Sequence, residues 1–125
     1  MNVRVLIVDD QPPFRAAARA VVDVTDGFEV VGEAETGEDS VSMCRSLKPD
    51  LVLMDVNLPG IDGLQATQQI LAQDSPVVLV LSTYEAAEYE PRATAAGAAA
   101  YIQKSDFGPD ELTRAWEEAQ KAIAS

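Results

Sequence analysis

The 125-residue chain contains no histidine and a single cysteine, Cys44. The lack of histidine excludes a Ser-His-Asp triad and any zinc site built on imidazole, and one thiol cannot complete a thiolate zinc site. A single cysteine also excludes an internal disulfide and is typical of a reducing compartment, so we expect a cytoplasmic location. The chemistry that remains is that of carboxylates and of hard metal ions with oxygen ligands.

Basic residues are also scarce. Nine Lys and Arg stand against 21 Asp and Glu, which gives a formal net charge of −12. Binding to nucleic acid depends on basic patches that contact phosphates, so we expect no direct nucleic-acid binding by this chain. No apolar run approaches the roughly 20 residues that a membrane-spanning helix requires, and the first residues do not resemble a signal peptide, so we expect no membrane association. The hydrophobic content of 47% indicates one ordinary globular domain.

Short runs of branched apolar residues alternate with segments of helical periodicity. The apolar runs predict five strands, the second of them at a sheet edge, at residues 3–8, 28–34, 51–55, 77–81 and 99–102. Helices are predicted to begin near Pro12, near the capping residue Thr36, near Gly63, near Ala86 and at the capping residue Gly108. This α/β alternation favours a doubly wound parallel sheet with right-handed crossovers.

Apolar spacing also predicts which helix faces are buried. The first helix is expected to bury Phe14, Ala17, Ala18, Val21 and Val22. The last helix is expected to bury Leu112, Ala115, Trp116, Ala119 and Ile123. Pro91 lies within the fourth predicted helix, residues 86–96, where an interior proline is expected to kink or shorten it.

Polar side chains stand at the C-terminal ends of four of the predicted strands. These residues are Asp9 and Asp10 after the first, Asp55 at the third, Ser82 after the fourth and Lys104 after the fifth. The C-terminal ends of parallel strands share one edge of a sheet, so these side chains can converge in one crevice. Three neighbouring carboxylates repel one another, and Mg²⁺ is a suitable counter-ion for a site made of oxygen ligands. The lysine and the hydroxyl are suited to hold anionic oxygens such as those of a phosphoryl group.

This order of residues, with the segments LIVDD, LVLMDVNLPGIDG, VLVLST and AGAAAYIQK, resembles the receiver domain of two-component response regulators, most closely the NarL/FixJ subfamily. The resemblance covers the whole chain. It implies a CheY-like, flavodoxin-like (βα)₅ fold with a five-stranded parallel sheet in the order 2-1-3-4-5. Residues 1–125 would form one receiver domain, and a helix-turn-helix output domain that binds DNA would lie outside this chain.

The resemblance implies that Asp55 accepts a phosphoryl group from a sensor histidine kinase. Mg²⁺, which Mn²⁺ can replace, would be bound by Asp10, Asp55 and the backbone carbonyl of Asn57, with Asp9 acting through water. The absence of histidine agrees with a donor histidine supplied by another protein.

Further residues match positions that respond to the phosphoryl group in the family. Ser82 and Lys104 would contact phosphoryl oxygens, and Tyr101 would change rotamer as Ser82 moves inward. Asn57 and Tyr84 match positions that tune the lifetime of the phosphoaspartate. The expected result is a switch at the surface of the fourth helix, fifth strand and fifth helix, with homodimerisation and transcription as its output. Such a domain can promote its own dephosphorylation, but it is not a turnover enzyme.

Several alternatives remain open from the residues. Thr83 is adjacent to Ser82 and also carries a hydroxyl, although Ser82 directly follows the apolar run. Ser105 stands where many receivers have a proline after the lysine, so a cis peptide bond is not expected there. A haloacid-dehalogenase-like phosphatase also uses an aspartyl nucleophile, although its Asp-x-Asp pattern differs from the adjacent Asp9 and Asp10. A third possibility is a receiver that acts only as an interaction module.

Overall fold

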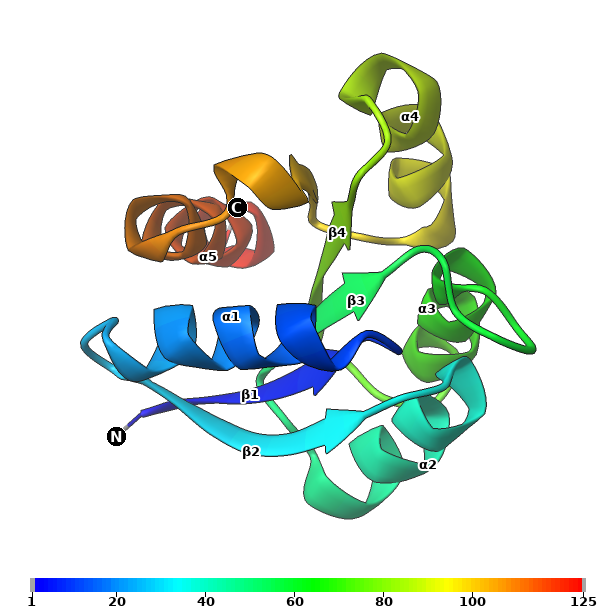
Figure 1. The fold of residues 1–125 in the computed structure, drawn as a ribbon, viewed down its shortest axis with the longest axis horizontal. Helices are drawn as coiled ribbons and strands as arrows, with labels where there is room; N and C mark the ends of the chain where they lie inside the picture. Colours follow the sequence, from blue (N-terminus) through cyan, green and yellow to red (C-terminus); the bar gives the residue numbers. More distant parts are fainter. Residues whose placement is uncertain (1, 125) are drawn as a thin grey trace.

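A five-stranded parallel sheet forms the centre of the computed structural model, which describes residues 2–124 (Figure 1). The strands are β1 (Val3–Val8), β2 (Phe28–Ala34), β3 (Leu51–Asp55), β4 (Val77–Ser82) and β5 (Ala100–Gln103). The helices are α1 (Pro12–Asp23), α2 (Gly37–Leu47), α3 (Gly63–Leu71), α4 (Ala86–Ala96), the 3₁₀ turn η1 (Lys104–Asp106) and α5 (Pro109–Ala124). The strand order is β2-β1-β3-β4-β5, which confirms the predicted doubly wound fold and the edge position of β2.

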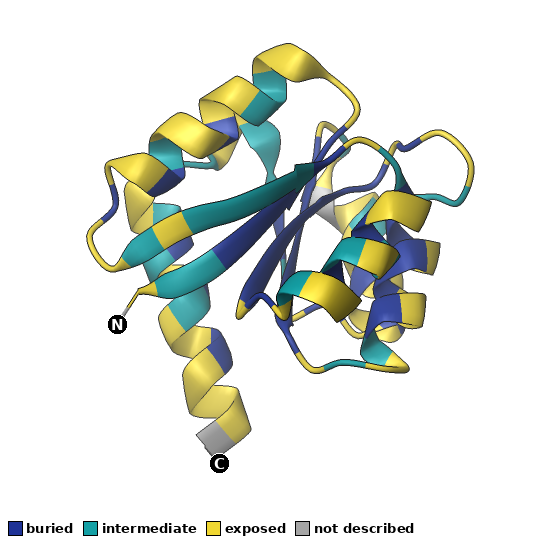
Figure 2. Ribbon diagram, turned by 90° about the horizontal axis from the view of Figure 1, so that it is seen from below, coloured by how far each residue is buried: buried dark blue, intermediate teal, exposed yellow. Residues whose placement is uncertain are grey.

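The helices cover both faces of the sheet. In Figure 1, α1 and α5 lie on one face, and α2, α3 and α4 lie on the other. One core packs against each face: Ile7, Val22 and Leu112 are buried in the first, and Leu6, Cys44 and Ile70 in the second. Because both faces are covered, the central strands are nearly continuous apolar runs and are the most buried part of the ribbon in Figure 2. Full burial of one such aliphatic side chain stabilises the fold by about 1.5–3 kcal/mol.

The strand register aligns the ends of the central strands. Val8 pairs with Met54, Met54 pairs with Val80, and Val80 pairs with Tyr101. The residues that follow this row on β1 and β3 are Asp9 and Asp55. Parallel pairing therefore brings residues that are 46 positions apart to the same edge.

Two helix starts are fixed by side-chain caps. The hydroxyl oxygen of Thr36 accepts a hydrogen bond from the backbone N–H of Asp39 at 3.0 Å, which confirms the predicted cap of α2. The Asp62 carboxylate accepts from the backbone N–H of Gln65, and the Gln65 side chain accepts from the backbone N–H of Asp62, so a complete capping box opens α3. This second cap matters for the site, because α3 begins next to the end of β3.

Pro91 does not shorten α4, which spans the residues that the sequence predicts. Proline removes one backbone donor and leaves the carbonyl four residues earlier without its helical partner. The side chain of Pro91 is exposed, as is most of this helix, so water can reach that turn. Of the two effects expected of Pro91, shortening of α4 is therefore wrong, and a kink stays a prediction.

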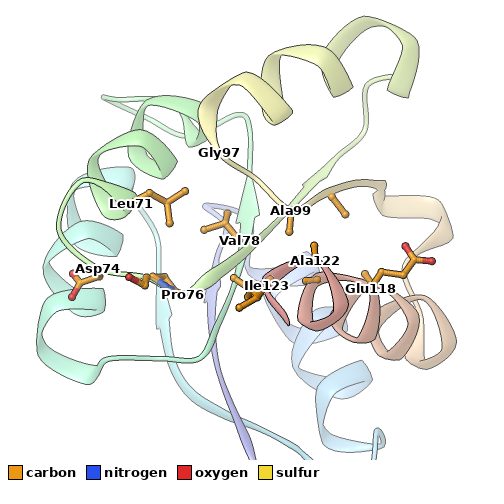
Figure 3. Close-up of a pocket in the computed structure, with 14 residues that line it drawn as sticks. Leu71, Asp74, Pro76, Val78, Gly97, Ala99, Glu118, Ala122 and Ile123 are labelled. Carbon is orange, nitrogen blue, oxygen red and sulfur yellow. The ribbon is translucent and has the colours of Figure 1, made fainter. Parts of the chain in front are cut away.

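Two residues assigned to buried helix faces are exposed instead. Ala17 faces solvent because successive helical residues are rotated by ~100°, and the buried stripe of α1 is centred on Ala18 and Val22. Ile123 is 69% exposed. It lies in the last part of α5 and lines an open apolar hollow of about 570 Å³ beside Pro76, near the residues where β4 and β5 begin (Figure 3).

Candidate functional site

Three carboxylates, the acid cluster Asp9, Asp10 and Asp55, meet at the C-terminal edge of the sheet. One oxygen of each lies within 4.8 Å of an oxygen of the others. Asp9 is 1% exposed and Asp55 is 5% exposed, whereas Asp10 faces solvent. Like charges packed this closely in a buried site destabilise each other unless a cation compensates them.

Lys104 provides a cation from the opposite end of the chain. Its Nζ atom donates a hydrogen bond to Asp9 Oδ2 at 2.7 Å and lies 3.3 Å from Asp55 Oδ1. The lysine side chain is itself 11% exposed, so this ion pair is screened little by water. Lys104 opens η1 directly after β5, and no cis peptide bond occurs between any of the residues that the structure describes, including the one before Ser105.

The backbone around Asp9 is tightly bound. Asp9 Oδ1 accepts a hydrogen bond from the backbone N–H of Gln11 at 2.8 Å, and Arg15 donates to the Asp9 carbonyl at 2.8 Å. Arg15 also forms ion pairs with Glu33 and Glu35 at the end of β2 and beyond. These contacts hold the first turn of α1 in place beside the acid cluster.

Burial raises the pKa of Asp55 to about 6, and the negative charge of Asp9 acts in the same direction. The Lys104 ammonium and the backbone N–H of Asn57 lower the pKa, but they compensate the burial only in part. The ionised carboxylate is therefore held at a cost in free energy near neutral pH. A further cation at the site would favour the ionised form.

The donor set of the acid cluster fits a hard divalent cation. All three groups are carboxylates, and their oxygens are close enough to share one ion. Mg²⁺ prefers oxygen ligands of this kind, commonly one or two carboxylates together with water and phosphate oxygens. The exposure of Asp10 leaves the cluster open to solvent on one side.

Gly63 allows α3 to begin against the end of β3. A Cβ atom at this position would lie 1.9 Å from the Asp55 carbonyl oxygen, and the Gly63 N–H donates to the Val56 carbonyl at 2.9 Å. We expect Gly63→Ala to destabilise the protein by about 2–3 kcal/mol, because the backbone of the site itself must move. Urea denaturation measures this effect.

Gly108→Ala is the matched control, because a Cβ atom at Gly108 would meet no atom within 4 Å. Gly108 directly precedes α5, where alanine is a poorer cap than glycine, so we expect a loss of no more than about 1 kcal/mol in the free energy of unfolding. Equal destabilisation by the two substitutions would contradict the role of the close approach at Gly63.

Two hydroxyl residues, one at the end of β4 and the other directly after it, differ in burial. Ser82 is buried at the end of β4, whereas Thr83 is exposed. The Ser82 oxygen accepts a hydrogen bond from the backbone N–H of Tyr84 at 3.1 Å, and the Ser82 side chain also hydrogen-bonds the side chain of Tyr101. Of the two residues, Ser82 has the side chain that lies inside the fold.

Tyr84 connects three parts of the site. Its hydroxyl accepts a hydrogen bond from the Asn57 amide at 2.8 Å, and its ring stacks on Tyr89 of α4 with centroids 4.4 Å apart. Its carbonyl accepts from the buried Tyr101 hydroxyl at 2.5 Å and from Gln103 at 3.3 Å. A displacement of the loop after β4 would therefore change the hydrogen bonds of Tyr84 both to Asn57 and to β5.

Two contacts in this region were not predicted. The sequence assigns Phe14 only to a buried helix face, yet its ring centroid lies 4.3 Å from Lys104 Nζ. Tyr89 was not singled out, and its stacking on Tyr84 has only a weak local signal, two tyrosines five residues apart. No spacing rule could pair residue 14 with residue 104, because that contact depends on how the first and last strands are placed.

Cys44 lies away from this site, in the core between α2 and the sheet. Burial raises the pKa of its thiol to about 12, and Asp74 adds to the shift. We expect the native protein to react with a thiol reagent at pH 8 roughly a thousand-fold more slowly than a free thiol, because almost no thiolate is present. With a reagent that releases a coloured thiolate when it reacts, absorbance measures this rate.

The control for Cys44 is Ser42→Cys, which adds a thiol at an exposed position of the same helix. We expect this variant to react once in the folded state and twice in urea. Rapid labelling of native wild-type protein would contradict the burial of Cys44.

A parallel sheet with an acid cluster at the C-terminal edge of its strands is typical of one family of proteins, and comparison with known families finds the same one. Residues 5–117 match the family described as the response regulator receiver domain, and the chain belongs to that family. Receiver domains of response regulators are signalling domains and not turnover enzymes, which removes the phosphatase alternative.

Among individual proteins, the chain is similar to the response regulator GacA of Pseudomonas aeruginosa, with 40% identity over 90% of this chain and 53% of GacA. It is similar to the response regulator UvrY of Escherichia coli, with 39% identity over 98% of this chain and 58% of UvrY. It also resembles the receiver domain of the response regulator NarL from Mycobacterium tuberculosis, with a TM-score of 0.86, 29% identity and coverage of 96% and 97% of the two chains.

These relatives confirm the predicted resemblance to NarL/FixJ-type receivers. The chain spans slightly more than half the length of GacA and of UvrY. Within residues 2–124, no helix is both long and apolar enough to cross a membrane.

Proposed function

We propose that this chain is the phosphoacceptor domain of a two-component response regulator and that Asp55 accepts the phosphoryl group. The observation that carries the proposal is the position of Asp55. Its carboxylate is buried at the end of β3, beside two further carboxylates and within 3.3 Å of the Lys104 ammonium. A buried nucleophile between a metal-binding set and a fixed cation suits transfer of an anionic group, in which position and electrostatics supply most of the catalysis.

In the proposed transfer, an oxygen of the Asp55 carboxylate forms a bond to phosphorus. The bond between phosphorus and the imidazole nitrogen of a sensor histidine kinase breaks, and its electron pair stays on that nitrogen. The donor histidine comes from the partner, because this chain has none. The product is an acyl phosphate on Asp55.

The acid cluster would hold Mg²⁺, or Mn²⁺ in its place, through Asp10, Asp55 and the backbone carbonyl of Asn57, with Asp9 acting through water. The fit rests on three carboxylates whose oxygens approach within 4.8 Å. When bound, the cation would neutralise charge on the phosphoryl oxygens.

Ser82 and Lys104 would convert the new phosphoryl group into a structural change. Lys104 already contacts the carboxylate that becomes phosphorylated, and the Ser82 hydroxyl can donate toward an added oxygen. Movement of Ser82 would displace the Tyr84 N–H that it binds, and with it the carbonyl that accepts from Tyr101. Through these hydrogen bonds the surface of α4, β5 and α5 would favour a second conformation, including a change in the Tyr101 rotamer.

Asn57 and Tyr84 would tune the lifetime of the acyl phosphate, because their hydrogen bond connects the loop after β3 to the loop after β4. Hydrolysis of the acyl phosphate, which the domain could itself promote, would reset the switch. The output would be homodimerisation in the cytoplasm, followed by transcriptional control through a helix-turn-helix domain outside these residues. The greater length of GacA and UvrY supports that arrangement.

The test of this function is incubation of the protein with acetyl phosphate, with and without Mg²⁺, followed by intact-mass measurement. We expect one phosphoryl group per chain, gained only when the cation is present. Size-exclusion chromatography of the phosphorylated sample would report dimerisation. A chain that gains no phosphate and keeps its oligomeric state would instead support the interaction-module alternative.

A further inference from the structure

Phe14 makes an unusual contact with the lysine of the site. Its ring, in the first turn of α1, has its centroid 4.3 Å from Lys104 Nζ. A cation within about 6 Å of an aromatic face is attracted by the ring quadrupole, and the attraction increases when the cation is shielded from water. Because the Lys104 side chain is only 11% exposed, this contact is of the shielded kind.

The three neighbours of the Lys104 ammonium differ in their geometry. Asp9 and Asp55 are hydrogen-bond acceptors at 2.7 Å and 3.3 Å, and the Phe14 ring attracts the ammonium through its face without a hydrogen bond. A hydrogen bond to a carboxylate is lost when the ammonium moves by about 1 Å, whereas an ammonium that moves by that distance from 4.3 Å is still within the ~6 Å over which a ring face attracts a cation. The ring can therefore hold the ammonium while its acceptors change.

The position of the ring is itself constrained. The hydrogen bonds from the Gln11 N–H to the Asp9 carboxylate and from Arg15 to the Asp9 carbonyl attach the start of α1 to the end of β1. Phe14 lies between these two anchor residues. The backbone that carries Phe14 is thus attached beside the acid cluster at both sides of this residue.

We propose that Phe14 is a positioning residue for phosphoryl transfer, which keeps the Lys104 ammonium at the acceptor while its partner changes from an Asp55 oxygen to a phosphoryl oxygen. This inference rests on the proposed function. With acetyl phosphate as donor, the Asp55 oxygen forms the new bond to phosphorus and the bond from phosphorus to the acetate oxygen breaks. Acetate leaves with the electron pair, and Lys104 keeps its proton throughout.

Phe14 also packs against the core between α1, α5 and the sheet, so a purely structural role must be separated from positioning. Phe14→Leu keeps an apolar side chain of similar reach and removes the ring, and Phe14→Tyr keeps the ring face. We expect Phe14→Leu to lower the phosphorylation rate constant by about tenfold, equivalent to ~1.4 kcal/mol in the barrier. Phe14→Tyr should retain most of the wild-type rate, and both variants should bind Mg²⁺ as wild type does.

A second measurement does not depend on folding differences between variants. Phenylalanines with one to four ring fluorines, incorporated at position 14, keep the shape of the ring and weaken its attraction for cations stepwise. We expect the logarithm of the rate constant to fall in step with the cation affinity of the ring, while the melting temperature stays constant.

The outcomes separate the two proposals. A wild-type chain that gains no phosphate overturns both the proposed function and the role of Phe14. A phosphorylated wild type with equal rates across the fluorinated series overturns only the role of Phe14, as does a Phe14→Leu variant that reacts at the wild-type rate.

Discussion

We expect the Asp55→Asn variant to gain no detectable phosphate from acetyl phosphate and Mg²⁺ under conditions that phosphorylate wild type. The amide lacks the anionic oxygen that forms the bond to phosphorus, and the other carboxylate beside Lys104, Asp9, follows β1 and is already hydrogen-bonded to the lysine. We expect the rate to fall by a factor of about a thousand or more, as is usual when the nucleophile of a covalent step is removed. Intact-mass measurement over time provides the rate.

Two further variants give this result its controls. Asp23→Asn removes an exposed carboxylate at the end of α1, and we expect it to react as wild type does. Asp10→Asn alters the acid cluster without removing the acceptor, so we expect a higher requirement for Mg²⁺. Rapid phosphorylation of Asp55→Asn would contradict the assignment of the acceptor.

Asp55→Asn is also expected to stabilise the protein at neutral pH. The pKa of Asp55 is about 6 in the folded state, against an ordinary value of 3.8, so the folded state binds this proton more tightly. Stability falls with rising pH wherever the folded state binds more protons than the unfolded state. Ionisation of Asp55 therefore costs wild type stability between about pH 4 and pH 6.5, and asparagine avoids that cost.

The difference of about two pKa units corresponds to ~3 kcal/mol. We expect Asp55→Asn to be more stable than wild type by about 2–3 kcal/mol at pH 7.5, and by close to zero at pH 4. Urea denaturation without divalent cations at a series of pH values measures the difference. Addition of Mg²⁺ should reduce it at neutral pH, because a cation at the acid cluster favours the ionised wild-type carboxylate. A gain in the free energy of unfolding that is independent of pH would show that ionisation of Asp55 is not its cause.

The fold was predictable because it depends on patterns that are local in the sequence. Branched apolar runs such as the one that ends at Asp55 specify buried parallel strands, and helical spacing around Val22 and Leu112 specifies the covering faces. The exposure of Ile123 was not predictable in this way, because an apolar stripe does not show how much of its helix other elements cover. Ala17 lies beside the buried stripe of α1, which is narrower than the apolar pattern predicts.

The site was predictable only in part. Parallel strands align their C-terminal ends, so the gathering of Asp9, Asp10 and Asp55 follows once the topology is known. The roles of these residues in phosphorylation remain predictions. The pairing of Lys104 with Asp9 in preference to Asp55 could not be derived, since it depends on differences of less than 1 Å between side chains.

The Tyr84 connections were also beyond prediction from the sequence. They join two loops and a strand through contacts of side chain to side chain and side chain to carbonyl. Loop conformations have no periodic pattern, and residues from distant loops meet only after the sheet has assembled. These contacts between loops can therefore be known only from the structure.

The most direct test of the phosphoacceptor assignment is to locate the phosphoryl group. Borohydride reduces an aspartyl phosphate to homoserine, and the modified position can then be found by tandem mass spectrometry of peptides. We predict homoserine at position 55 in wild-type protein treated with acetyl phosphate and Mg²⁺, and none when the cation is omitted. Homoserine at Asp9 or Asp10 with an unmodified Asp55 would contradict the account.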